Sequence, residues 1–110
     1  MEKTLNYYPE LGHMVGVKAS LVISQALEWT RYLPNKNKGW FCRTREDWES
    51  SLGLTRREQE TARRKLVSLG ILEEKLQGMP ARLWFRIDSK RLIKILIGRR
   101  KQPNILYNRI

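Results

Sequence analysis

Two helix-start signals only eleven residues apart constrain the fold of this chain more than any other feature. Thr44 is followed three residues later by Asp47, and Thr55 is followed three residues later by Glu58. A Thr hydroxyl that accepts from the backbone three residues on, with an acidic side chain reaching back, forms the capping box that begins a helix. Two such starts require a sharp turn between them, and Gly53 can supply the positive φ of that corner.

The second of these helices is predicted over residues 56–69, with one apolar and one basic side. Ala62, Leu66 and Leu69 recur at spacings of four and three residues, so they lie on one side of a helix. Gly70 is expected to end the helix. The opposite side carries Arg57, Glu60, Thr61, Arg64 and Lys65.

A β-hairpin is predicted directly after this helix. Residues 82–87 alternate Leu, Phe and Ile with Arg, Trp and Arg, the period of two expected of a half-buried strand. Residues 71–76 form its partner strand, and Gln77-Gly78-Met79-Pro80-Ala81 is a turn sequence. Residues 40–43 can add a short third strand to the hairpin.

The remaining segments complete an α+β chain. Apolar residues recur at helical spacing over residues 17–33, and Pro34 is expected to end that helix. Asp88 is positioned to cap a last short helix over residues 89–97, which Gly98 would close. Pro9 and Gly12 act as breakers in the segment before the first helix. The expected organisation is an N-terminal arm over 1–15, a folded domain over 16–97 and a basic tail over 98–110.

The order of these elements is that of a winged helix-turn-helix. Such a fold has a three-helix core and a two- to three-stranded β-wing, here with an extra C-terminal helix. It usually holds duplex nucleic acid by placing the second helix of its helix-turn-helix in the major groove.

The charge of the chain favours a polyanionic partner. Lys and Arg number 22 against 11 Asp and Glu, a net charge of +11. Residues 1–55 are nearly neutral, with 7 basic and 6 acidic side chains, whereas residues 89–110 carry 7 basic side chains and none acidic. Because the excess is concentrated in the second half of the chain, it indicates a binding surface rather than uniform charge for solubility.

Residues of the basic helix are the first candidates for DNA contact. Arg57, Thr61 and Arg64 lie one helical turn apart on its outward side, and arginine can bind guanine O6 and N7 in a bidentate manner. Arg82, at the edge of the hairpin, could contact phosphate or the minor groove. The competing interpretation is a solvated helix whose arginines pair with neighbouring glutamates. The candidate DNA-binding residues are Thr55, Arg56, Arg57, Thr61, Arg64, Lys65 and Arg82.

The sequence gives no support to catalysis, to a metal or to a cofactor. His13 is the single histidine, and ligand spacing of His, Cys or carboxylates is missing. Gly53, Gly70 and Gly78 are isolated and form no phosphate-binding loop. We therefore expect a protein that is not an enzyme.

The same sequence predicts a soluble, cytoplasmic protein with no membrane partner. No signal-peptide pattern opens the chain. The apolar run at residues 92–97, interrupted by Lys94, is far shorter than the roughly 20 residues of a membrane span.

Several segments together resemble the N-terminal winged-helix domains of replication-initiator-like proteins of bacteriophages and other bacterial mobile elements. Residues 16–29 are similar to the first helix of that family, and residues 40–48 to its strand-helix unit. Its recognition helix and wing are similar to Leu54-Thr55, Leu66, Leu69-Gly70-Ile71-Leu72 and residues 78–88. The resemblance spans roughly residues 15–97. It implies recognition positions at Arg57, Thr61 and Arg64, and a wing contact at Arg82.

The resemblance implies double-stranded DNA as the main partner, in transcription control or in replication. Replication members usually carry a further C-terminal domain, and this chain ends at Ile110, so a stand-alone regulator is expected as much as an initiator. A homodimer would suit a two-fold operator, and the tail segment Ile105-Leu106-Tyr107 is apolar enough to pack on a second subunit.

Two further functions stay open at this point. A protein-interaction module, an inhibitor or adaptor that docks on a host or phage protein, could be built on the same scaffold. Single-stranded nucleic acid could instead bind through Trp84 and the tail.

Overall fold

The computed structural model describes the backbone of residues 9–101 and the side chains of residues 9–98. Over this range the chain is α+β, with helices gathered on a three-stranded antiparallel sheet. The elements in chain order are α1 (Pro9–Val15), α2 (Val17–Arg31), the 3-10 helix η1 (Asn35–Asn37), β1 (Phe41–Cys42), α3 (Arg45–Leu52), α4 (Arg56–Ser68), β2 (Leu72–Gln77), β3 (Arg82–Ile87) and α5 (Ser89–Lys101).

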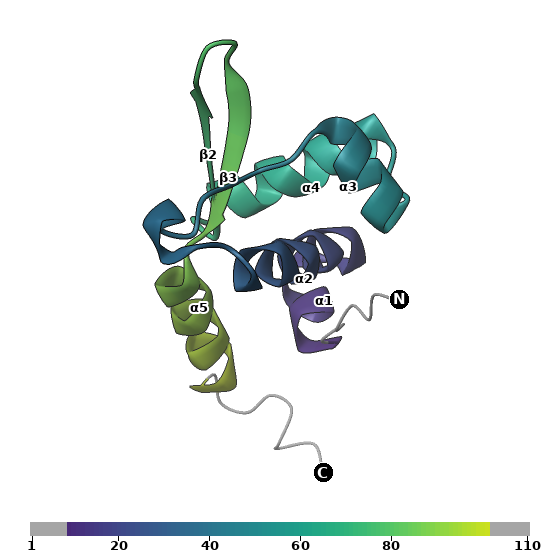
Figure 1. Ribbon diagram of the computed structural model, residues 1–110. Helices are drawn as coiled ribbons and strands as arrows, with labels where there is room; N and C mark the ends of the chain where they lie inside the picture. Colours follow the sequence, from purple (N-terminus) through teal and green to yellow (C-terminus); the bar gives the residue numbers. More distant parts are fainter. Residues whose placement is uncertain (1–8, 102–110) are drawn as a thin grey trace.

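The expected hairpin and its third strand are confirmed. The sheet has the order β1-β3-β2, and both pairings are antiparallel. Leu72 pairs with Ile87, and Phe41 pairs with Phe85, so apolar residues of all three strands share the core face. The hairpin and α5 extend from the helical body in opposite directions (Figure 1).

Four aromatic rings form the centre of the core. Trp29 of α2, Phe41 of β1, Trp48 of α3 and Phe85 of β3 are all less than one-tenth exposed. The ring centroids of Trp29 and Trp48 lie 4.7 Å apart, and those of Trp48 and Phe85 lie 5.5 Å apart, both edge to face. Edge-to-face packing of this kind adds to the free energy gained by burial alone. The cluster therefore fixes two helices and two strands against one another.

Both capping boxes form as the sequence predicts. The Thr44 hydroxyl oxygen accepts from the Asp47 backbone N–H at 3.1 Å, and the Asp47 carboxylate accepts from the Thr44 N–H at 2.9 Å. Thr55 and Glu58 make the same pair of bonds at 3.2 and 2.9 Å. Between the two helices Gly53 has φ of +70°, and its N–H donates to the Glu49 carbonyl. The corner between α3 and α4 is therefore set by local hydrogen bonds.

A buried glutamine ties the start of α4 to this corner. Gln59 is 3 % exposed. Its side-chain amide donates to the Leu54 carbonyl at 3.0 Å and to the Arg45 carbonyl at 3.4 Å. The Leu54 carbonyl lies outside both helices and Arg45 is the first residue of α3, so Gln59 ties α4 to the corner and to α3.

The assignment of residues 1–15 to an N-terminal arm is wrong for residues 9–15, which form α1. Gly12 does not break this helix, because α1 buries Leu11 and Val15 in the same core as α2. The free energy of that burial offsets the weak helix propensity of glycine. Residues 1–8 of the predicted arm lie outside the described residues.

The basic tail also begins later than expected, because Gly98 does not close the last helix. The helix α5 continues through Gly98 to Lys101. Leu92 is buried, and the Arg91 side chain donates to the Leu69 carbonyl, whereas Ile93 and Ile97 are about half exposed. The remainder of the tail, residues 102–110, lies outside the described residues, as does the proposed apolar contact at Ile105-Leu106-Tyr107.

In the described part of the chain, no helix has both the length and the apolar character that a membrane crossing requires.

The two buried glutamines of the domain provide a test of how α4 is positioned. We expect Gln59→Leu to lower the free energy of unfolding by about 1–3 kcal/mol, because it leaves the buried Leu54 carbonyl without its donor. Gln25→Leu is the matched control. Gln25 is also 3 % exposed, but its amide nitrogen has no hydrogen-bond partner within the described region, so its loss should be neutral or stabilising. Urea denaturation followed by tryptophan fluorescence measures both variants, and equal losses would contradict the role of Gln59.

Candidate nucleic-acid interface

Helix α4 presents opposite sides to the core and to solvent. Ala62 and Leu66 are 5 % and 0 % exposed and pack in the core beside the buried Gln59. On the opposite side of the helix, Arg57, Thr61 and Arg64 are all exposed. The hydrophobic anchoring of one side therefore holds these three side chains together on the other side, as the sequence predicts.

Carboxylates neutralise one flank of α4 and leave its outward side unpaired. Arg56 pairs with Glu60 at 3.0 Å. Arg63 pairs with Glu74 of β2 at 3.6 Å, and its guanidinium lies over the Phe85 ring. Among the residues that the structure describes, Arg57 and Arg64 have neither an ion pair nor a hydrogen bond through their side chains. The two arginines that point outward are thus the two that remain available to a ligand.

Beside that flank lies a concavity of about 640 Å³, which we call the arginine basin. It is enclosed by α4, the start of α3 and the strands β1 and β3, and it is lined in part by Trp48 and Phe85. Two carboxylates, those of Asp47 and Glu60, also line it. The arginines that define the basin are Arg43, Arg45, Arg56, Arg63 and Arg82.

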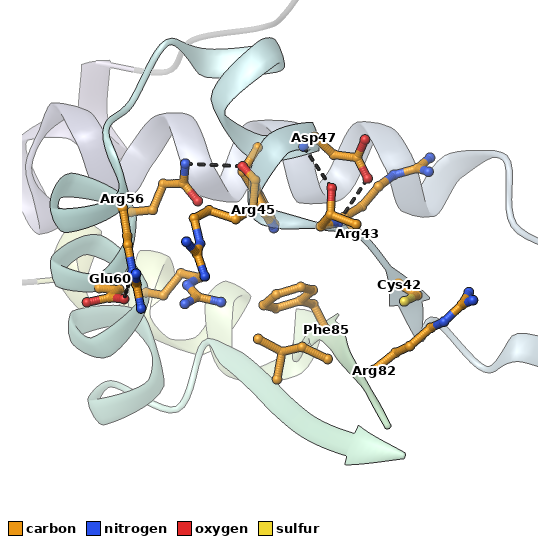
Figure 2. Close-up of a pocket in the computed structure, with 13 residues that line it drawn as sticks. Cys42, Arg43, Arg45, Asp47, Arg56, Glu60, Arg82 and Phe85 are labelled. Atoms are coloured by element: carbon orange, nitrogen blue, oxygen red, sulfur yellow. Dashed lines mark hydrogen bonds and ion pairs between the residues drawn. The ribbon is translucent and has the colours of Figure 1, made fainter. Parts of the chain in front are cut away.

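The charges of the basin are spread from α4 to the edge of the sheet. Figure 2 shows the Arg56–Glu60 pair at one end, and the guanidinium groups of Arg43 and Arg82 at the other, pointing away from α4. Arg45 projects between them. Arg43 also stacks on Trp29, with its guanidinium carbon 4.8 Å from the ring centroid. The arrangement can contact a chain of phosphates rather than one anion, because the cations are not directed at a single point.

Both carboxylates in the basin remain ionised. The Thr44 backbone N–H lowers the pKa of Asp47 below its ordinary value by hydrogen bonding to the carboxylate. The Arg56 side chain lowers the pKa of Glu60 in the same way. Five arginines against two fixed negative charges leave the basin with a clear positive balance.

Six of the seven candidate DNA-binding residues lie in α4 or at the residue that caps it. Thr55 caps α4, Arg56 faces the basin, and Lys65 lies on the opposite flank, toward the start of α2. Arg82 lies across the basin from α4, and it is exposed. All seven are exposed. Arg57, Thr61 and Arg64 lie on the outward side of α4, whereas Arg56 and Arg82 lie toward the basin and Lys65 lies on the other flank.

Arg43 and Arg45 are the residues that sequence reasoning missed. They flank the capping residue Thr44, and the sequence analysis treated that segment as a strand followed by a helix start. Their position in the chain was the available signal. Thr44 caps α3 directly after the edge strand β1, so its two neighbours lie where the strand meets the helix.

Trp84, the candidate for base stacking, is only partly exposed. It lies on the outer face of the sheet with Arg82 and Arg86, opposite the face of Phe85. The ring of the neighbouring Trp40 is already covered by the Lys75 ammonium at 4.1 Å and the Arg86 guanidinium at 4.6 Å. This face therefore offers less free aromatic surface than the sequence suggests.

A search for three or more His, Cys, Asp or Glu side chains that could share a metal ion finds none in the described region. Comparison of the chain with protein-family models, with curated proteins and with solved structures found no significant match.

The ion pair that joins α2 to α4 predicts how stability depends on pH. Lys18 contacts Glu58 at 2.6 Å. This contact and the Thr55 N–H lower the pKa of Glu58 from 4.5 to about 2. Because the folded-state pKa lies below the ordinary value, the stabilisation is fully present above about pH 4.5 and is lost as the pH falls toward 2.

We therefore expect Glu58→Gln to lower the free energy of unfolding at pH 7 and to reduce its decline between pH 5 and pH 2. Urea denaturation across a pH series measures both effects. The control is Glu49→Gln, an exposed carboxylate of α3. An unchanged pH dependence in Glu58→Gln, or an equal change in Glu49→Gln, would contradict this account.

Proposed function

We propose that this chain is a winged helix-turn-helix protein that binds double-stranded DNA without catalysing a reaction. In this assignment α2, α3 and α4 form the three-helix core, α4 is the recognition helix, and the β2–β3 hairpin is the wing. The biological role is then that of a phage- or mobile-element-type regulator of transcription or a factor in replication, as the family resemblance implies.

One observation carries this proposal: the outward side of α4 presents Arg57, Thr61 and Arg64 with no carboxylate partner among the described residues. Arginine is the side chain that most often reads guanine in the major groove, where an α-helix fits. The carboxylates of α4 that do pair, Glu58 and Glu60, lie on its two flanks. The free positive charge is therefore on the side that would enter a groove.

The arginine basin extends this surface toward the hairpin. Phosphate contacts fix the register of a protein on a duplex, and base contacts then specify the sequence. Arg43, Arg45 and Arg82 supply the first kind of contact on one side of α4, while Arg57 and Arg64 supply the second. A duplex lying against α4 and the hairpin would meet both sets.

Base reading predicts an unequal loss when the outward arginines are removed. We expect Arg57→Ala and Arg64→Ala each to weaken binding to a selected duplex by about 1–3 kcal/mol, and binding to a random duplex much less. Fluorescence anisotropy on duplexes selected from a random pool measures both. The charge-matched control is Lys36→Ala, an exposed residue of η1 that should change neither.

The salt dependence tests the phosphate contacts separately. If about six Lys and Arg side chains neutralise phosphates, log K should fall with log salt at a slope of about −5, from roughly −0.9 per contact. The double variant Arg43→Ala, Arg82→Ala should reduce the magnitude of that slope by about 2 while keeping the preference for the selected duplex. An unenriched pool without salt dependence would overturn the DNA proposal.

A protein-interaction module is the second candidate, and the tip of the hairpin favours it. Met79 is fully exposed and Leu76 is 73 % exposed, although both are apolar. Exposed apolar side chains at a protruding tip suit a pocket on a partner protein. Under this alternative, partner binding survives Arg57→Ala and Arg64→Ala and fails in Leu76→Ser, Met79→Ser, whereas duplex binding is weak in the unaltered chain.

A further inference from the structure

A second hollow, of about 500 Å³, lies on the other flank of α4 from the arginine basin. It runs between α4 and the corner where α1 ends and α2 begins, and we call it the α2–α4 groove. Its volume is within the range of pockets that hold small molecules. The residues that the argument uses are Gly16, Val17, Lys18, Arg57, Ala62 and Lys65.

Small side chains at the corner keep the α2–α4 groove open. Gly16 has φ of +91°, a conformation that favours glycine, and a Cβ at this position would lie 4.0 Å from the Lys65 ammonium nitrogen. Ala19 of α2 and Ala62 of α4 are among the lining residues, and both are almost fully buried. Val17, which is 57 % exposed, adds an apolar wall. The groove therefore offers an apolar body, unlike the arginine basin.

The rim of the groove is positively charged. Arg57 and Lys65 line it without an ion-pair partner within the described region, and Lys18 is already paired with Glu58. Three cations against one carboxylate attract an anion. The apolar wall, in turn, gains free energy from contact with an apolar group. A second copy of this chain, with the same net charge of +11, does not have that complementarity.

We propose that the α2–α4 groove binds a small amphiphilic anion, with its acidic group held by Arg57 and Lys65 and its apolar body against Val17. Arg57 and Lys65 also belong to the proposed DNA surface. An occupied groove would therefore compete with a duplex for the same two cations. This consequence rests on the proposed function, whereas ligand binding itself does not.

The probe for the groove is 8-anilinonaphthalene-1-sulfonate, an aromatic sulfonate whose fluorescence rises in apolar surroundings. We expect saturable binding of one molecule per chain, with the amide signals of residues 15–19 and 57–65 shifting in NMR spectra. The neutral analogue N-phenyl-1-naphthylamine should bind more weakly, because it lacks the acidic group.

Variants of the two cations separate this site from general attraction to a basic protein. Arg57→Gln and Lys65→Gln should each weaken sulfonate binding about 1.4-fold to fivefold, the range for losing one exposed charge contact. Lys65→Arg should restore it, and Lys36→Gln, which removes the same charge from η1, should have no effect. Both substituted residues are exposed, so the fold is expected to persist.

Equal weakening by Lys36→Gln, equal affinity for the neutral analogue, or amide shifts elsewhere in the chain would overturn the proposal. The competition is measured by adding the sulfonate to a complex with labelled duplex and following anisotropy. If the chain binds the sulfonate in the groove but binds no duplex, the proposed function fails and the ligand site stands. If the duplex binds and the sulfonate does not, the ligand site alone fails.

Discussion

The contact among Trp29, Phe41, Trp48 and Phe85 is the interaction on which the rest of the structure depends. These four rings come from α2, β1, α3 and β3, and each ring contacts at least two of the others. Because they are large and almost fully buried, they leave little freedom for α3 to turn relative to the sheet. The capped corner between α3 and α4 then fixes the position of α4 relative to α3. The hairpin and the basic helix are thus held in a fixed relation, and the Arg63–Glu74 ion pair between α4 and β2 adds to it.

The division of charge on α4 follows from the same anchoring. Once Ala62 and Leu66 are buried, the helical period decides which arginine faces which neighbour. Arg63 is brought to the sheet, where it reaches Glu74 and the Phe85 ring, so part of its charge serves the fold. Arg57 and Arg64 are brought to solvent, where the described residues provide no acidic partner. Five basic residues that look equivalent in the sequence therefore have different roles in the structure.

The sequence predicts the features that depend on near neighbours. Both capping boxes, the Gly53 corner and the alternation of β3 involve residues within a few positions of one another, and the structure confirms them. Prediction from the sequence fails where contacts between residues far apart in the chain determine the structure. Gly12 remains helical because α2 lies against Leu11 and Val15, and α5 passes Gly98 without a local signal for doing so. Arg43 and Arg45 enter the candidate site only because α3, α4 and the sheet enclose a common concavity.

The two hollows on either side of α4 differ in the chemistry they offer, and this difference bears on which ligand each can hold. The arginine basin is lined by five arginines, and the guanidinium groups of Arg43, Arg56 and Arg82 lie at different ends of it. This arrangement suits an extended polyanion whose charges are spaced along a chain. The α2–α4 groove combines apolar walls with Arg57 and Lys65, which suits a compact anion with an apolar part. Arg57 lines the groove and also belongs to the outward side of α4, so the proposed duplex and the proposed anion would compete for it. A helix that offers the same cation to both a duplex and a small anion provides a direct physical route by which one ligand can displace the other.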